Sequence, residues 1–185
     1  MKHQFQAALI ITASILLASA PSAAQTFGDG VAAYSLQQYE RAHAIWLRLA
    51  EEGDGQAQFR LAMLYDMGFG VEANEAEAAK WYRRAAEGGE ADAQLALAFK
   101  LRDGRGVPED KVEAVQWFRR VARKGYPRAQ FELASHYLLG EGVEKDPREA
   151  YRWFEMAYTN YPDGPERRRA AEVMKQLAVI LDIGQ

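Results

Sequence analysis

The sequence predicts an all-α protein that folds as a right-handed α-solenoid of stacked antiparallel helix pairs. Residues 57–92, 93–128 and 129–164 repeat one pattern with a 36-residue period. Within each repeat the apolar residues follow helical spacing, and a Gly-x-Gly-Val segment separates two such stretches. Periods of about 20–50 residues are typical of solenoids, in which each unit buries its apolar face only against its neighbours.

Residues 1–24 have the pattern of a secretory signal peptide. Lys2 supplies a positive start, residues 7–20 a short apolar core, and residues 22–24 a small-residue cleavage site. Cleavage after Ala24 is expected to leave a periplasmic or secreted protein without stable membrane insertion. The alternative, a retained membrane anchor, is disfavoured because a span needs about 20 apolar residues. The sequence has no cysteine, which excludes disulfides and lipid attachment through cysteine.

Residues 25–56 are predicted to form a diverged repeat that caps the N-terminal end of the stack. Ala42, Trp46 and Ala50 precede the matching positions of the next unit by 36 residues. The first helix, near residues 31–36, is short, and the Gly-x-Gly loop is replaced by a tighter turn. An atypical terminal unit of this kind can cover the end of a solenoid core.

The first helix of each repeat is predicted to place four core residues on one face. In the first repeat they are Ala57, Leu61, Ala62 and Tyr65, at offsets of 0, 4, 5 and 8. The matching residues are Ala93, Leu97, Ala98 and Leu101, and then Ala129, Leu133, Ala134 and Tyr137. Since glycine tolerates a positive φ, the Gly-x-Gly pair that follows is expected to end this helix and turn the chain back.

The second helix of each repeat is predicted to begin with a capping box and to carry an aromatic core face. The boxes are Asn74-x-x-Glu77, Asp110-x-x-Glu113 and Asp146-x-x-Glu149. The inward residues are Ala78, Trp81, Tyr82 and Ala85, the matching Ala114, Trp117, Phe118 and Val121, and then Ala150, Trp153, Phe154 and Ala157. A large aromatic residue at this helical spacing indicates core rather than a cofactor site.

Residues 165–185 are predicted to form a C-terminal capping helix. Its inward face is expected to carry Val173, Leu177, Ile180 and Leu181, with residues 167–169, Glu172 and Lys175 in water. Residues 158–162 differ from the residues that end the earlier repeats, so we expect the regular stacking to stop here. A polar-backed terminal helix closes the last apolar face of a solenoid.

The pattern resembles the Sel1-like repeat family, a relative of the tetratricopeptide repeats. The resemblance rests on Ala-Gln-x-x-Leu-Ala, Gly-x-Gly-Val and Ala-x-x-Trp-Tyr/Phe-x-x-Ala, in register over 108 residues. It implies a non-catalytic interaction module, and related proteins act as adaptors of the bacterial cell envelope. One secreted branch of the family is associated with β-lactam binding and hydrolysis, but this chain lacks the paired cysteines of that branch.

Few residues suggest catalysis. His43 and His136 are the only histidines after residue 24, and they lie far apart in the repeat order. Leu64, Lys100 and His136 share one repeat position, which we therefore expect to be a partly exposed helix surface. No zinc-ligand spacing occurs, and the Gly-x-Gly pairs follow helices and lack the lysine of a phosphate-binding loop. We expect no catalytic residue, no cofactor and no metal.

The charge of the chain disfavours nucleic acid as a partner. The net charge is −3 and the isoelectric point is about 5.7, whereas nucleic-acid binding usually requires a basic stripe. Basic residues do cluster at 119–128 and at 167–169. We interpret both clusters as solvated helix backs, with docking of an acidic partner as the alternative.

The sequence favours a protein or peptide partner that binds in a concave groove lined by the first helices. The positions expected to line it are Met63, Asp66, Met67, Phe99, Arg102, Asp103, Ser135, Leu138 and Leu139. One alternative is an envelope enzyme acting on peptidoglycan or a β-lactam, which requires convergent polar groups in a cleft. Another is a structural protein that self-associates through Phe27, Tyr34 or Leu181, although a monomer is favoured.

Overall fold

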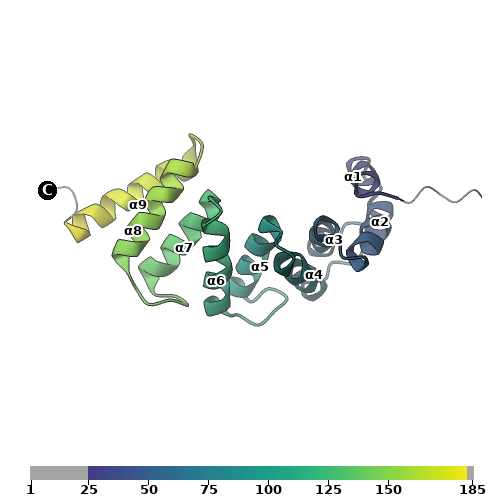
Figure 1. Ribbon diagram of the computed structural model, residues 1–185, viewed down its shortest axis with the longest axis horizontal. Helices are drawn as coiled ribbons and strands as arrows, with labels where there is room; N and C mark the ends of the chain where they lie inside the picture. Colours follow the sequence, from purple (N-terminus) through teal and green to yellow (C-terminus); the bar gives the residue numbers. More distant parts are fainter. Residues whose placement is uncertain (1–24, 183–185) are drawn as a thin grey trace, which may run out of the picture.

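A computed structural model describes residues 25–182 of the chain (Figure 1). Within that range there are nine helices and no strand. The helices are α1 Phe27–Ser35, α2 Tyr39–Glu51, α3 Gly55–Met67, α4 Glu75–Glu87, α5 Ala91–Asp103, α6 Lys111–Ala122, α7 Pro127–Leu139, α8 Pro147–Asn160 and α9 Pro165–Leu181. The predicted signal peptide, residues 1–24, lies outside the described residues.

The helices form one row, with α1 and α9 at its opposite ends (Figure 1). The closely packed pairs are consecutive helices, from α1 against α2 to α8 against α9. Such nearest-neighbour packing is the defining property of a solenoid. The predicted fold class, an all-α solenoid of stacked helix pairs, is therefore confirmed.

The core is built from the residues that recur with the period. Ala57, Leu61 and Ala62 are completely buried, as are the matching residues of α5 and α7. The aromatic residues of α4, α6 and α8 pack on them, with Phe118 and Phe154 fully enclosed. The core has two parts: a long cluster from Ala33 to Leu133, and a smaller one around Ala134, Ala150, Phe154 and Leu177.

The glycine loops have two separate functions in this packing. Gly104 ends α5 in the left-handed conformation, with φ of 66°, as predicted for a helix C-cap. Gly106, with φ of 73°, lies against the start of α4, where a Cβ atom would be 2.0 Å from the backbone oxygen of Glu75. The second glycine of the motif is therefore required by the contact between neighbouring repeats as well as by the turn.

The predicted capping boxes are only half formed. Asp110 accepts a hydrogen bond from the backbone N–H of Glu113 at 2.8 Å, as a cap should. The reciprocal bond predicted from Glu113 is wrong, because the backbone N–H of Asp110 donates instead to the carbonyl of Leu101. The N–H groups of Asn74 and Asp146 make the same kind of bond to the preceding helix. Glu113 is left to bind other side chains, Arg83 and Trp117.

A buried glutamine in each of α3, α5 and α7 donates a hydrogen bond to the helix that precedes it. The side-chain amides of Gln58, Gln94 and Gln130 donate to the carbonyls of Ala50, Ala86 and Ala122, eight residues earlier, at 2.9 to 3.1 Å. These carbonyls lie in the last turn of the preceding helix and also accept from the backbone N–H of Gly53, Gly89 and Gly125, so each glutamine adds a second hydrogen bond. The glutamine of the Ala-Gln-x-x-Leu-Ala motif is thus a structural residue.

The last helix does not follow the period of the others. The helices α3, α5 and α7 begin 36 residues apart, whereas α9 begins at Pro165, 38 residues after Pro127. Its buried face carries Ala170 and Leu177, with Val173 and Leu181 packed alongside. The prediction for Ile180 was wrong: this side chain is 73 % exposed.

Candidate binding groove

Two adjoining hollows lie on the face built by α3, α5, α7 and the start of α9. Their volumes are about 340 and 620 Å³, and they share Arg128 and Glu132. We call this continuous depression the groove. Its lining residues are Asp66, Ala96, Phe99, Lys100, Arg102, Asp103, Arg105, Pro127, Arg128, Phe131, Glu132, Tyr161, Pro162, Glu166 and Arg169.

Two aromatic rings form the apolar part of the groove. Phe99 packs edge-on against Phe118, with ring centroids 5.2 Å apart, and Phe131 packs in the same way against Phe154 at 5.0 Å. Both groove rings are half-buried. Edge-to-face pairs at this separation are favourable. The core of each repeat therefore fixes one ring whose remaining surface is available to a ligand.

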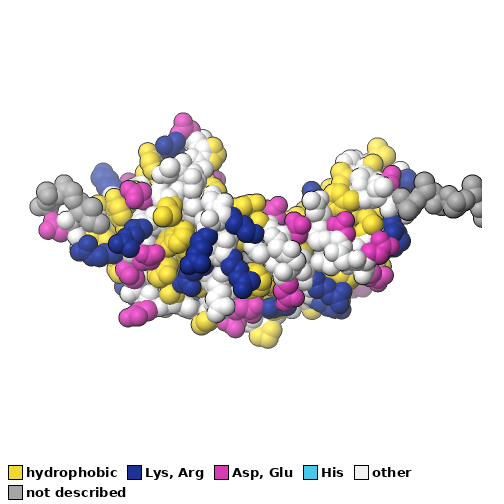
Figure 2. Space-filling view, in the orientation of Figure 1, with side chains coloured by type: hydrophobic (Ala, Val, Ile, Leu, Met, Phe, Trp, Pro, Cys, Tyr) yellow, Lys and Arg dark blue, Asp and Glu magenta, His cyan; other side chains and the backbone are white. Residues whose placement is uncertain are grey.

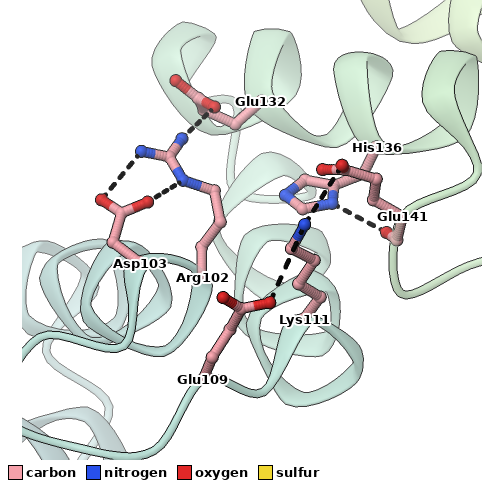
Figure 3. Close-up of polar contacts among 7 residues, drawn as sticks. All are labelled: Arg102, Asp103, Glu109, Lys111, Glu132, His136 and Glu141. Atoms are coloured by element: carbon pink, nitrogen blue, oxygen red, sulfur yellow. Dashed lines mark hydrogen bonds and ion pairs between the residues drawn. The ribbon is translucent and has the colours of Figure 1, made fainter.

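Arg102 is held in place by hydrogen bonds to Asp103 and Glu132 (Figure 3). Its guanidinium donates to both carboxylate oxygens of Asp103, at 2.7 and 3.1 Å, and to Glu132 at 2.8 Å. The guanidinium carbon lies 4.8 Å from the centroid of the Phe99 ring. The hydrogen bonds from Arg102 lower the pKa of the Asp103 carboxyl, so this cluster stays charged near neutral pH.

The repeat position shared by Leu64, Lys100 and His136 is buried, so the expectation of a partly exposed surface was wrong. The three side chains have at most 4 % of their surface exposed. The Lys100 ammonium is compensated by Asp66 of the preceding repeat, at 2.5 Å. His136 forms a 2.8 Å hydrogen bond between Nδ1 and the backbone oxygen of Glu141 (Figure 3). Polar residues are tolerated here because each has a nearby partner.

The third repeat and α9 enclose the larger part of the groove. The connection from α8 to α9, residues 161–164, contributes Tyr161 and Pro162 to the wall. Arg169 of α9 lies over Phe131, with 5.2 Å from its guanidinium carbon to the ring centroid. Burial raises the pKa of the Tyr161 hydroxyl; Glu132 and Glu166 raise it further, while Arg128 and Arg169 lower it. Both guanidiniums therefore act on the same hydroxyl.

The structure brings together four of the nine residues expected to line a groove. Asp66, Phe99, Arg102 and Asp103 line the groove, whereas Met63, Met67, Ser135, Leu138 and Leu139 line neither of its hollows. Met67 and Leu139 are exposed, and Leu138 packs into the second core cluster.

Glu132 was not singled out from the sequence, and Arg128 and Arg169 were noted only as members of the basic clusters at 119–128 and 167–169, which were interpreted as solvated helix backs. The sequence signal that could have identified Glu132 is the recurrence of oppositely charged residues 30 positions apart. Arg102 with Glu132, Arg83 with Glu113, Glu75 with Arg105 and Lys111 with Glu141 all form ion pairs at this separation. Residues 30 apart therefore lie side by side on adjacent helix pairs.

The remaining polar candidates have local partners. The Ser135 hydroxyl donates to the carbonyl of Phe131 at 3.0 Å, and His43 lies 3.3 Å from the Tyr65 hydroxyl. Burial lowers the pKa of His43. Within residues 25–182, no cluster of three metal-ligating side chains occurs. In the same range no helix is both long and apolar enough to cross a bilayer.

This chain belongs to the Sel1 repeat family. The family's sequence model matches residues 55–90, 91–126 and 127–160, each beginning with the first helix of a pair. Sel1 repeat proteins are typically protein-interaction modules, and the fold is generally a non-enzymatic scaffold. No curated protein sequence matches the chain significantly.

Solved structures share the fold. A Sel1 repeat protein from Oxalobacter formigenes is 29 % identical, with a TM-score of 0.77, over 86 % of this chain and 64 % of that protein. A protective antigen of uropathogenic Escherichia coli with an SLR fold is 36 % identical, with a TM-score of 0.62, over 65 % of this chain. The match spans 26 % of the antigen, so this chain corresponds to part of each protein's length.

Proposed function

We propose that this protein is a non-catalytic interaction module of the bacterial cell envelope that binds an extended protein segment in its groove. The observation that carries the proposal is the continuous depression over α5 and α7, in which Phe99 and Phe131 are fixed by the core but remain half-exposed. Rigid aromatic residues beside charged side chains are typical of binding surfaces for protein segments.

The envelope location rests on the leader-like pattern of residues 1–24 and is part of the proposal. Cell fractionation with an antibody against the folded chain tests it. The protein is expected in the periplasmic or extracellular fraction, with Gln25 as its first residue. Recovery from the cytoplasm with Met1 retained would contradict the location and leave the groove proposal unaffected.

Filling the groove tests the binding surface. Ala96 is a small, half-buried residue on the groove wall that packs against the core, so Ala96→Trp should fill the depression with its larger side chain. Gln116→Trp, at an exposed position on α6, is the matched control. Partners that native protein retains from an envelope extract should be lost by Ala96→Trp and kept by Gln116→Trp, with unchanged helicity by circular dichroism. Equal retention by both variants would overturn the proposal.

A further inference from the structure

Charge is distributed very unevenly along the repeats. Residues 93–128 contain nine Lys and Arg against four Asp and Glu, a net charge of +5. The flanking units are acidic, with net charges of −3 for residues 57–92 and −4 for residues 129–164. Figure 2 shows Lys and Arg side chains gathered over α6. Five of the nine cations of residues 93–128 lie on α6 or just after it and do not line the groove, whereas Lys100, Arg102, Arg105 and Arg128 do.

Most groove cations are already neutralised. Lys100 is paired with Asp66, Arg105 with Glu75, and Arg102 with Asp103 and Glu132. Among residues 25–182, no carboxylate lies within ion-pair distance of Arg128 or Arg169. These two side chains are exposed, and their contacts are with the ring faces of Phe99 and Phe131.

The two guanidiniums belong to one site. Both line the larger hollow of the groove, and both act on the Tyr161 hydroxyl. The carboxylates in that wall are Glu132, which Arg102 neutralises at 2.8 Å, and Glu166 at the exposed start of α9. Arginine contacting an aromatic ring retains its hydrogen-bond donors for a carboxylate. The site therefore offers two oriented donors of positive charge beside an apolar floor.

We propose that the groove recognises an acidic segment of a protein partner, whose carboxylates bind Arg128 and Arg169 and whose apolar side chain packs on Phe131. The inference rests on the proposed function and names the chemistry of the partner. The lining of the groove carries five Lys and Arg against four Asp and Glu, and this small positive excess favours the approach of such a segment at low ionic strength.

Fluorescence anisotropy with defined peptides tests this chemistry. The probes are three labelled peptides in which one Phe is flanked on each side by two Asp, two Asn or two Lys residues. The native protein should bind the Asp peptide about tenfold more tightly than the Asn peptide, and the Lys peptide most weakly. At about 1 M salt, where the Debye length is about 3 Å, the preference should nearly disappear.

Charge reversal gives the sharper result. Arg128→Glu with Arg169→Glu should invert the order, so that the Lys peptide binds best. Arg148→Glu with Arg168→Glu is the matched control, because it changes the net charge equally at exposed residues that line neither hollow. The control should keep the native order. An inverted order also shows that the groove has remained folded.

Three results would overturn the inference. They are no binding of the Asp peptide at concentrations up to about 1 mM, equal affinity for the Asp and Asn peptides at low salt, and a charge-reversed protein that keeps the native order. If Ala96→Trp still abolishes capture of a partner while the peptides show no charge preference, groove binding stands and only its acidic chemistry is rejected.

Discussion

The second and third repeats, residues 93–128 and 129–164, share one plan of packing but differ in charge and in the way they end. In both, the first helix buries Ala-Leu-Ala and the second buries an aromatic residue, Phe118 or Phe154. The net charge is +5 in one and −4 in the other. The Ala-Leu-Ala positions of the first helix are thus the same in both repeats, whereas the buried position of Lys100 and His136 and the surface positions differ.

The two repeats also differ in the connection that follows their second helix, and this connection shapes the groove. In both repeats the side-chain oxygen of the buried glutamine accepts a hydrogen bond from a residue at or just after the end of the second helix. Lys124 donates to Gln94 at 3.1 Å, and Asn160 donates to Gln130 at 3.0 Å. The connection after Asn160 then departs from the period, and the wall of the larger hollow includes Tyr161 and Pro162. The segment from the start of α8 to the start of α9 is two residues longer than the period predicts, and the connection at its end forms part of the groove wall.

The largest expected effect comes from truncating the aromatic core. Phe118→Ala and Phe154→Ala should each lower the free energy of unfolding by about 3–5 kcal/mol, because both rings are fully enclosed. Hydrogen exchange should separate them. Phe118→Ala should loosen helices on both sides of α6, whereas Phe154→Ala should loosen α7 to α9 and leave α2 to α4 protected. Identical exchange patterns would show that the two core clusters unfold as one.

A second test compares the buried polar position of the two repeats. Lys100→Leu should cost about 2–3 kcal/mol, since it leaves Asp66 unpaired, and adding Asp66→Ala should recover much of this loss. His136→Leu should change stability by less than about 1.5 kcal/mol, because Leu64 occupies this position in the first repeat. Urea unfolding measures all three. An equally stable Lys100→Leu protein would contradict a structural role for the ion pair.

Loss of the buried glutamine hydrogen bond should lower the stability of the protein by a smaller amount in either repeat. Gln94→Leu and Gln130→Leu should each destabilise the protein by about 0.5–1.5 kcal/mol, because the carbonyl of Ala86 or Ala122 loses one of its two donors and keeps the backbone N–H of Gly89 or Gly125. Thermal unfolding of the two variants and of exposed Gln116→Leu provides the comparison. A loss at Gln116 as large as at Gln94 would reject the assignment.

The smallest predicted effect depends on pH. Arg83 lowers the pKa of Glu113, so their ion pair stabilises the folded state above the ordinary glutamate pKa, and this contribution is lost as the pH falls through the lowered value. Arg83→Gln should therefore cost up to about 1 kcal/mol at pH 7 and progressively less as the pH falls below the ordinary glutamate pKa. Denaturant unfolding across this range measures the difference. A cost that does not change with pH would remove the electrostatic explanation.

The periodic part of the fold could be predicted from the sequence. Phased alanine, leucine and aromatic residues follow directly from the packing of one helix pair on the next, and the structure buries them as expected. Lys100 and His136 could not be placed in this way, because the partners that allow their burial, Asp66 and the carbonyl of Glu141, are not visible in the hydrophobic pattern.

The groove was predictable only in part, for a similar reason. Helical spacing indicates which residues avoid the core, and it identified Phe99 and Arg102. Whether Arg128 and Arg169 share a hollow depends on how far α9 is displaced relative to α7, which the 36-residue period does not specify.

Site-specific photo-crosslinking in living cells tests the central claim, that the groove face binds a protein segment. A photoreactive phenylalanine analogue is placed at Ala96 in the groove or at exposed Gln116 on α6. The account predicts a discrete crosslinked adduct from position 96 and none from position 116. An adduct from position 116 alone would place the binding surface on the second helices and contradict the account.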